Sequence, residues 1–273
     1  MSLVPAPLLV FDFDGVLVDG MEEYWWSSRR AALDLLAAPP ERSLPEAVPL
    51  AFRQLRPLIH KGWEMVLVAA ELGRATPEPL PTTAAGYAGF LARALEHWSW
   101  QPATLQRALE AVRAGAIATD RAGWLARHRF YPGVVERLHR LRHEGATWRV
   151  LTTKGAAFSR ELLGAAGLEP AGLDGHEQGP KTEVLKRLLA ESEPGGGPLW
   201  FIEDRRATLT EVRACPELAP VRCWLAAWGY LAPGDGEGLG PQGMDWLDEA
   251  HFRGPLETWD SPAPAPGSNA NRR

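Results

Sequence analysis

The sequence predicts an α/β protein with a doubly wound parallel sheet and an inserted helical domain. Short apolar runs recur along the chain with amphipathic helical patterns between them. This alternation is typical of a parallel sheet that helices cover on both faces. A stretch of about 110 residues interrupts the alternation, and it shows helical patterns, Pro-rich connections and little that resembles a strand.

The predicted strands are apolar runs bounded by turn residues. The first, residues 8–13, lies between Pro7 and Gly15 and is typical of a strand buried on both faces. Apolar residues at helical spacing precede the second and third runs. The remaining predicted strands are residues 146–153, 198–204 and 220–228.

These patterns also predict the domain boundaries. Residues 1–20 and 131–255 are expected to form the sheet domain, and residues 21–130 a helical cap inserted after the first strand. Pro132 marks the return to the sheet domain, because proline is favoured at the first position of a helix. Residues 256–273 are rich in proline and small polar residues towards their end, and we expect them to form a disordered tail.

Composition restricts the classes of partner. The formal net charge of −5 argues against a nucleic-acid surface, which needs clustered Lys and Arg. The two cysteines, Cys215 and Cys223, suggest neither a zinc cluster nor a disulfide framework, so a cytoplasmic location is expected. No secretion signal and no apolar run long enough to span a bilayer is evident, so no membrane partner is predicted. Oligomeric state is not indicated.

Polar side chains follow three predicted strands at the carboxyl end, where open parallel sheets bind their ligands. Side chains alternate along a strand, so the acids of the first pair point to the same side and can share one cation. Such a pair could instead cap a helix, but its position and the second acidic pair favour a metal site. Ligands that are all oxygen favour Mg²⁺ over Zn²⁺. The residues are Asp12 and Asp14, Thr152 and Thr153, and Glu203 and Asp204.

Four segments resemble the motifs of the haloacid dehalogenase-like (HAD) hydrolases. "VFDFDGVLVD" is similar to the first motif, which implies that Asp12 is the nucleophile and Asp14 the general acid and base. "VLTTK" resembles the second and gives Thr152 the role of binding a phosphoryl oxygen. "GPKTEVLKRLL" resembles the third, with Lys181 as the cation that stabilises the transition state. "WFIEDRRATL" resembles the fourth, an acid at a strand end.

The resemblance covers the whole sheet domain and is to phosphoglycolate phosphatase-like members with a helical cap. It implies a Rossmann-like core and Mg²⁺-dependent hydrolysis of a small phosphomonoester through an aspartyl-phosphate. The implied metal ligands are Asp12, the backbone carbonyl of Asp14, and Asp204. Many members have a second Asp in the fourth motif where this chain has Thr208. Glu203 could supply the missing carboxylate, which leaves open which acid of the pair touches the metal.

The inserted domain is expected to select the leaving group of the substrate, a small phosphorylated metabolite. Its most suggestive stretch is "RQLRPLIHKGWEMVL", which could recognise a carboxylate or a second phosphate, although an ordinary loop between cap helices has a similar composition. The candidate substrate-binding residues are Arg56, Lys61, Gly62 and Trp63 in this stretch, with Thr153 beside the second motif.

Two other functions remain open at this point. A phosphomutase of the β-phosphoglucomutase type would use the same chemistry but let the product rebind in place of water. A catalytically silent protein that binds a phosphorylated ligand is disfavoured because Asp12, Asp14, Thr152, Lys181 and Asp204 are all present.

Overall fold

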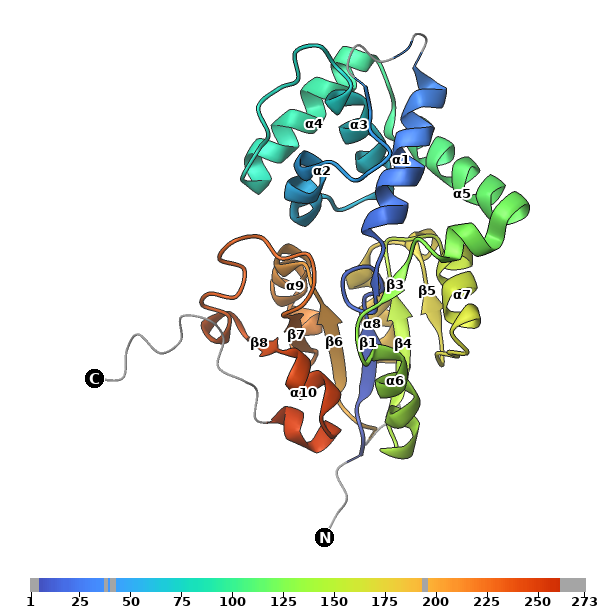
Figure 1. Cartoon of the computed structure of the whole chain (residues 1–273). Helices are drawn as coiled ribbons and strands as arrows, with labels where there is room; N and C mark the ends of the chain where they lie inside the picture. The colour runs from blue at the N-terminus through green and yellow to red at the C-terminus, as the bar shows by residue number, and fades with distance from the viewer. Residues whose placement is uncertain (1–4, 37–38, 40–42, 193–195, 261–273) are drawn as a thin grey trace. The chain divides into compact units, whose positions relative to one another are not determined.

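The computed structural model describes residues 5–36, 39, 43–192 and 196–260 (Figure 1). The chain divides into two compact units. Unit 1 comprises Met1–Asp19 and Phe130–Arg273, and unit 2 comprises Gly20–Arg129. Among the described residues, no helix has both the length and the hydropathy that a membrane span requires.

Unit 1 contains a six-stranded parallel sheet in the order β5, β4, β1, β6, β7, β8, which confirms the predicted fold class. Strands β1, β4, β6 and β7 lie within the four predicted runs. The two edge strands lie outside them, because they are too short, or too close to Gly-rich turns, to show a clear apolar run. The bounds are β1 Leu8–Phe11, β4 Thr147–Leu151, β5 Leu173–Asp174, β6 Leu199–Glu203, β7 Arg222–Ala226 and β8 Met244–Leu247.

Helices cover both faces of this sheet (Figure 1). Helices α8 and α9 pack against the face that Val10 and Phe201 line. Because neighbouring residues of a strand point to opposite faces, Phe11 and Trp200 line the other face, which α6, α10 and η5 cover. The helices of unit 1 are α6 Val134–His143, α7 Ala156–Ala165, α8 Lys181–Ala190, α9 Arg206–Arg213 and α10 Glu249–Arg253, with 3₁₀ turns η2 His176–Gln178, η3 Pro216–Leu218, η4 Gly240–Gln242 and η5 Leu256–Asp260.

The C-terminal segment belongs to the core, which corrects the predicted start of the disordered tail at residue 256. Trp259 in η5 is completely buried. The centroid of its ring lies 5.9 Å from the ring centroid of Trp200 and 5.7 Å from that of Trp224. Burial of a large aromatic surface offsets the entropy lost when this segment is ordered. The remainder of the predicted tail, residues 261–273, lies outside the described residues.

In the described part of unit 2, helices joined by loops lead to its last residue, where β3 (Arg129–Phe130) begins and pairs with β2 (Val18–Asp19) in a two-stranded sheet. Its central helices α1, α3 and α5 pack against one another. The bounds are α1 Met21–Leu35, α2 Leu50–Leu55, η1 Arg56–Leu58, α3 Gly62–Leu72, α4 Ala84–Trp98 and α5 Pro102–Leu125.

A buried ion pair joins α1 to α5 inside unit 2. Glu23 on α1 is completely buried and accepts two hydrogen bonds from Arg113 on α5, at 2.8 and 2.7 Å. Trp124 Nε1 donates a third at 3.3 Å to the same carboxylate. An unpaired charge in this position would cost several kcal/mol, so the pair specifies how the two helices align.

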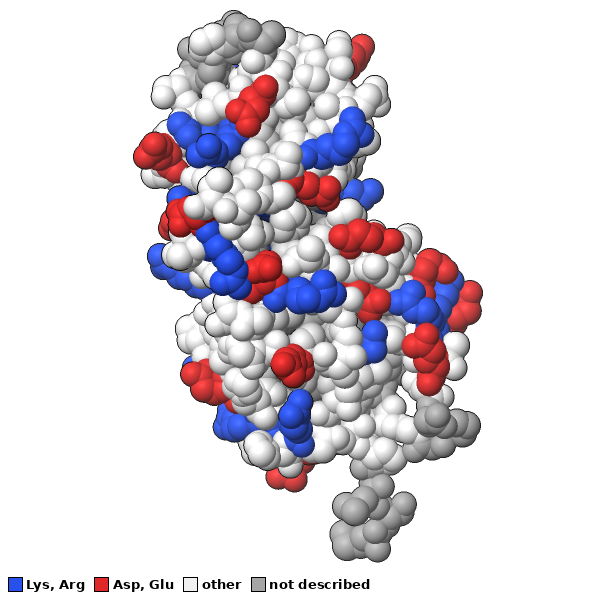
Figure 2. All heavy atoms as spheres, turned by 90° about the vertical axis from the view of Figure 1, so that its right-hand side faces the viewer, with Lys and Arg blue, Asp and Glu red and all other residues white. Residues whose placement is uncertain are grey.

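Charged side chains of both signs are interspersed on the face of the molecule that Figure 2 shows. A protein that binds nucleic acid usually carries Lys and Arg clustered along one face. On this face the two signs alternate instead.

Replacing Trp259 with Ala should destabilise unit 1 by about 3–5 kcal/mol, because the change removes a buried ring from the aromatic layer. Urea unfolding of the full chain, followed by circular dichroism, measures this loss. The exposed Glu257 lies two residues away in the same turn, and Glu257→Ala is the matched control that should change stability by less than about 0.5 kcal/mol. Equal stability of Trp259→Ala and the wild type would contradict a structural role for η5.

Candidate active site

The polar residues predicted at strand ends gather around the end of β1. The chain runs from β1 to β4 and β5 on one side, then returns to β6 on the other, so β1 lies at the switch point of the sheet. Phe11 pairs with Val150 of β4 and Ile202 of β6. Asp12, one residue further, donates its backbone N–H to the Ile202 carbonyl at 2.8 Å. This register places Asp12 beside Glu203 at the edge where both strands end.

Three carboxyl groups converge there. One oxygen from each of Asp12, Glu203 and Asp204 lies within 4.8 Å of the other two, and all three residues are buried. Lys181, the first residue of α8, donates to Asp12 Oδ1 at 2.7 Å and to Glu203 Oε2 at 2.6 Å. One ammonium group offsets only part of the charge of three carboxylates. The donor set of buried carboxylate oxygens fits a divalent cation such as Mg²⁺.

Burial and neighbouring charges shift the pKa values of Asp12, Glu203 and Lys181. Burial, reinforced by the charge of Glu203, raises the pKa of Asp12 to about 7, although Lys181 opposes the shift. Burial also raises the pKa of Glu203. For Lys181 burial alone would lower the pKa, but the charges of Asp12 and Glu203 raise it above its usual range. The neighbouring acids therefore favour the protonated lysine, and a divalent cation beside the carboxyl groups would favour their ionised forms.

Asp14 contacts a residue that the sequence interpretation did not include. Lys154 Nζ donates to the two oxygens of Asp14 at 3.0 and 3.3 Å. The Lys154 side chain is buried, and its backbone N–H donates to Thr152 Oγ1 at 3.0 Å. The signal was present in "VLTTK", where the lysine directly follows the two threonines, but a lysine in a loop after a strand usually faces solvent.

The two threonines differ in their surroundings. Thr152 directly follows β4 and is buried, whereas Thr153 is half-buried. Thr152 Oγ1 acts as acceptor towards Lys154, so its hydroxyl hydrogen can be donated to a ligand. The structure thus brings Asp12, Glu203, Asp204 and Lys181 together and links Thr152 to Asp14 through Lys154.

The candidate substrate-binding residues of unit 2 lie around the start of α3. Arg56 donates to the Ile59 carbonyl at 3.2 Å. The Trp63 backbone N–H donates to Gln106 of α5 at 3.1 Å, and Lys61 precedes the first turn of α3. A Cβ on Gly62 would lie 2.9 Å from Leu109, so close packing of α3 against α5 explains this glycine. A role of these residues in binding substrate stays a prediction.

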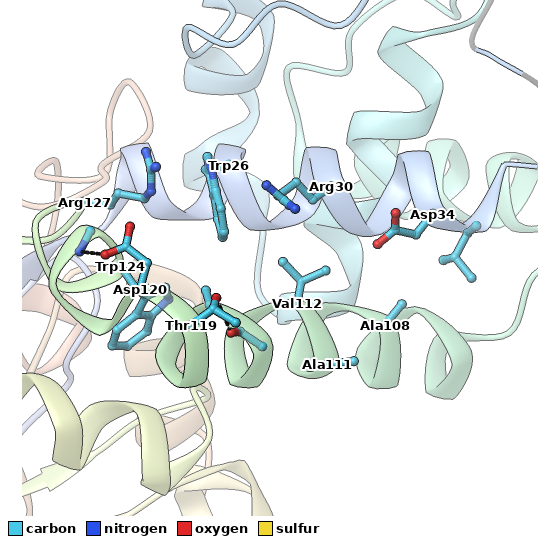
Figure 3. Close-up of a pocket in the computed structure, with 14 residues that line it drawn as sticks. Trp26, Arg30, Asp34, Ala108, Ala111, Val112, Thr119, Asp120, Trp124 and Arg127 are labelled. Atoms are coloured by element: carbon cyan, nitrogen blue, oxygen red, sulfur yellow. Dashed lines mark hydrogen bonds between the residues drawn. The ribbon is translucent and has the colours of Figure 1, made fainter.

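Unit 2 also carries a pocket of about 700 Å³ between α1 and α5 (Figure 3). The guanidinium groups of Arg30 and Arg127 lie 4.8 and 4.6 Å from the ring centroid of Trp26 at one end of it. Small residues of α5, including Ala108 and Ala111, line its floor. None of the four candidate residues of unit 2 belongs to the lining, so this pocket does not support their predicted role.

Comparison with known proteins places these residues in a family context. Residues 7–209 match the family described as haloacid dehalogenase-like hydrolase. No curated protein matches the chain.

Solved structures share the fold at low sequence identity. A structure described as a predicted phosphoglycolate phosphatase from Haemophilus somnus has 17% identity, covers 92% of this chain and 97% of its own, and gives a TM-score of 0.57. A predicted phosphatase from Clostridium acetobutylicum has 15% identity, coverage of 89% and 94%, and a TM-score of 0.55. A hydrolase from Pseudomonas syringae has 16% identity, coverage of 88% and 92%, and a TM-score of 0.52.

Divalent metal should stabilise the folded protein, because it would bind the three carboxylates only when the strands bring them together. At a free Mg²⁺ concentration of about 100 times Kd, the expected gain is about 2.7 kcal/mol. Thermal melting with MgCl₂, against NaCl of equal ionic strength, measures it. Asp204→Asn should abolish the gain, whereas Asp245→Asn, an acid of β8 outside the cluster, should keep it. An equal gain in both variants would mean that the ion binds elsewhere.

Proposed function

The chain belongs to the haloacid dehalogenase-like hydrolases, and from that premise we propose that it is a magnesium-dependent phosphatase of a small phosphomonoester. The observation that carries the proposal is the contact of one lysine, Lys181, with both Asp12 and Glu203 beside Asp204. The proposed nucleophile, the lysine cation and the proposed metal ligands thereby meet at the switch point of the sheet. Both cysteines are free thiols, which supports a cytoplasmic location.

In this proposal Asp12 attacks the phosphorus atom of the substrate and forms an aspartyl-phosphate as the ester oxygen leaves. Hydrolysis of that intermediate regenerates the Asp12 carboxylate and releases inorganic phosphate. The Lys181 ammonium group and the Thr152 hydroxyl stabilise the charge on the phosphoryl oxygens. A bound Mg²⁺ would offset the repulsion between the anionic nucleophile and the anionic substrate.

The proposed metal ligands are Asp12, the backbone carbonyl of Asp14, and the acidic pair. Within the pair we favour Asp204 as the main ligand. Both oxygens of Glu203 accept hydrogen bonds, from Lys181 Nζ at 2.6 Å and from the Arg205 backbone N–H at 3.0 Å. Glu203 therefore orients the lysine and adds negative charge beside the ion.

Asp14 is the proposed general acid and base. It would protonate the leaving oxygen in the first step, then take a proton from the water that attacks the aspartyl-phosphate. Lys154 contacts this carboxyl group through a buried ammonium and holds it in place. Lys154 is thus a positioning residue for the proton transfer.

The proposed substrate is a small phosphorylated metabolite. The Haemophilus somnus structure is described as a phosphoglycolate phosphatase, which makes small phosphorylated carboxylates the first compounds to test. The helical unit 2, residues 20–129, is the proposed cap that selects the leaving group. Arg56, Lys61, Gly62 and Trp63 are its candidate contacts, and Thr153 is a candidate contact beside the second motif.

The wild type should release inorganic phosphate from at least one small phosphomonoester when Mg²⁺ is present. EDTA should stop the release, and Asp12→Asn should reduce it to background because the amide cannot attack phosphorus. A malachite-green assay over a panel that includes phosphoglycolate and sugar phosphates measures the rates. If a sugar phosphate is isomerised without phosphate release, the enzyme is a phosphomutase and the phosphatase proposal fails.

Replacing Lys154 with Met should lower kcat about 10- to 100-fold, because Asp14 loses the group that orients it for proton transfer. Steady-state kinetics with the best ester of the panel gives kcat and KM separately, and KM should change little. Lys186→Met is the matched control, since Lys186 is partly exposed and pairs with the exposed acids Glu183 and Glu217. A normal kcat for Lys154→Met would remove Lys154 from the mechanism.

A further inference from the structure

The loop that follows β7 lies directly against the acidic cluster, which consists of Asp12, Glu203 and Asp204. This loop, residues 227–231 ("AWGYL"), contacts three points near the end of β1. The Tyr230 backbone N–H donates to Asp204 Oδ2 at 2.7 Å, and the hydroxyl of the same tyrosine donates to Asp19 Oδ1 at 2.6 Å. Trp228 Nε1 donates to the Val16 carbonyl at 2.9 Å. Tyr230 therefore links Asp204, a proposed metal ligand, to Asp19, the last residue of unit 1 before the chain enters unit 2.

Two glycines show how closely the backbone encloses Asp204. A Cβ on Gly15, whose φ is +97°, would lie 1.9 Å from Asp204 Oδ2 and 2.9 Å from Tyr230 Cδ2. A Cβ on Gly229 would lie 2.2 Å from Asp204 Cβ. The loops that follow β1 and β7 thus hold the carboxyl group between them. Any shift of residues 229–230 changes the space in which that group can turn.

We propose that Tyr230 is a positioning residue that orients Asp204 for metal binding, with its phenol anchored on Asp19. The inference rests on the proposed function, because it takes Asp204 as a metal ligand. The contact between the Tyr230 N–H and the carboxylate is a hydrogen bond to an ionised group, which is short and directional. Hydrogen-bond partners of metal-ligating carboxylates commonly set the orientation of those ligands.

The phenol gives the loop an anchor next to its glycine. Gly229 precedes Tyr230 directly, and a glycine allows the backbone many conformations. The phenol reaches from the loop to Asp19 at the end of β2 and restricts that freedom. Tyr230 lies outside the four motif segments, 26 residues after Asp204 and 211 residues after Asp19. Its contribution depends on the side-chain hydroxyl, so a single substitution can remove the anchor and leave the backbone N–H in the chain.

The direct test is Mn²⁺ binding to the full chain without substrate, measured by electron paramagnetic resonance. Tyr230→Phe should raise the Kd for Mn²⁺ about 3- to 10-fold, the range expected for losing one hydrogen bond that fixes a ligand. Asp19→Ala should have the same effect. Asp19→Asn keeps a carbonyl oxygen that can accept from the phenol and should restore binding close to the wild type.

The double variant Tyr230→Phe/Asp19→Ala distinguishes the loss of this one hydrogen bond from a general loss of structure. If both residues act through one hydrogen bond, the double variant should bind Mn²⁺ no more weakly than either single variant. Tyr87→Phe is the matched control, since it removes a hydroxyl that donates to Glu64 inside unit 2 at 3.2 Å. Melting temperatures show that each variant is folded. Wild-type Mn²⁺ affinity in Tyr230→Phe, or effects that add in the double variant, would overturn the proposal.

Kinetics give a second measurement and separate the two proposals. In Tyr230→Phe the Mg²⁺ concentration for half-maximal phosphate release should rise about 3- to 10-fold, while kcat at saturating Mg²⁺ should stay near the wild type. If the wild type binds Mn²⁺ but releases no phosphate from any ester, the proposed function fails and the Mn²⁺ affinities still decide the role of Tyr230. If the wild type does not bind Mn²⁺, the positioning role is overturned whatever the ester panel shows.

Discussion

Three buried carboxyl groups lie together at the end of β1, where one ammonium group contacts two of them, and the arrangement of unit 1 depends on how their charge is offset. Asp12 and Glu203 lie side by side because the parallel register of β1 and β6 makes them neighbours. Lys181 from the start of α8 contacts both. Without that contact the burial of adjacent acids would be strongly unfavourable. The remaining negative charge is what makes the site suited to a divalent cation.

The rest of unit 1 keeps these groups in place. Aliphatic side chains of α8 and α9 pack under one face of the sheet, and an aromatic layer that ends with Trp259 covers the other. The strands are therefore packed on both faces. Around the acids, two further contacts do the positioning: Lys154 holds Asp14, and the loop that contains Tyr230 encloses Asp204.

The sequence predicted four strands of the sheet, a helical segment over residues 21–130, and which polar residues follow each strand. Apolar runs and helical periodicity are local patterns, so they can be recognised without knowing the fold. The edge strands β5 and β8 and the burial of Trp259 were not recognised. A short segment beside glycine and proline has the composition of a loop. Its structure can be recognised only from the segment that packs against it in the folded chain. Lys154 was missed for the same reason, since its burial becomes visible only in the folded chain.

By itself, then, the sequence determined that Asp12, Thr152 and Glu203 stand at or directly after the carboxyl ends of strands, because alternation and spacing along the chain are enough to place them. Only the tertiary structure decided which groups contact one another. Lys154 and Asp14 are 140 residues apart, Lys181 and Asp12 are 169 apart, and Tyr230 and Asp19 are 211 apart. Such contacts depend on the order in which the strands assemble around β1. The packing of the whole sheet sets that order, and no single segment of the sequence shows it.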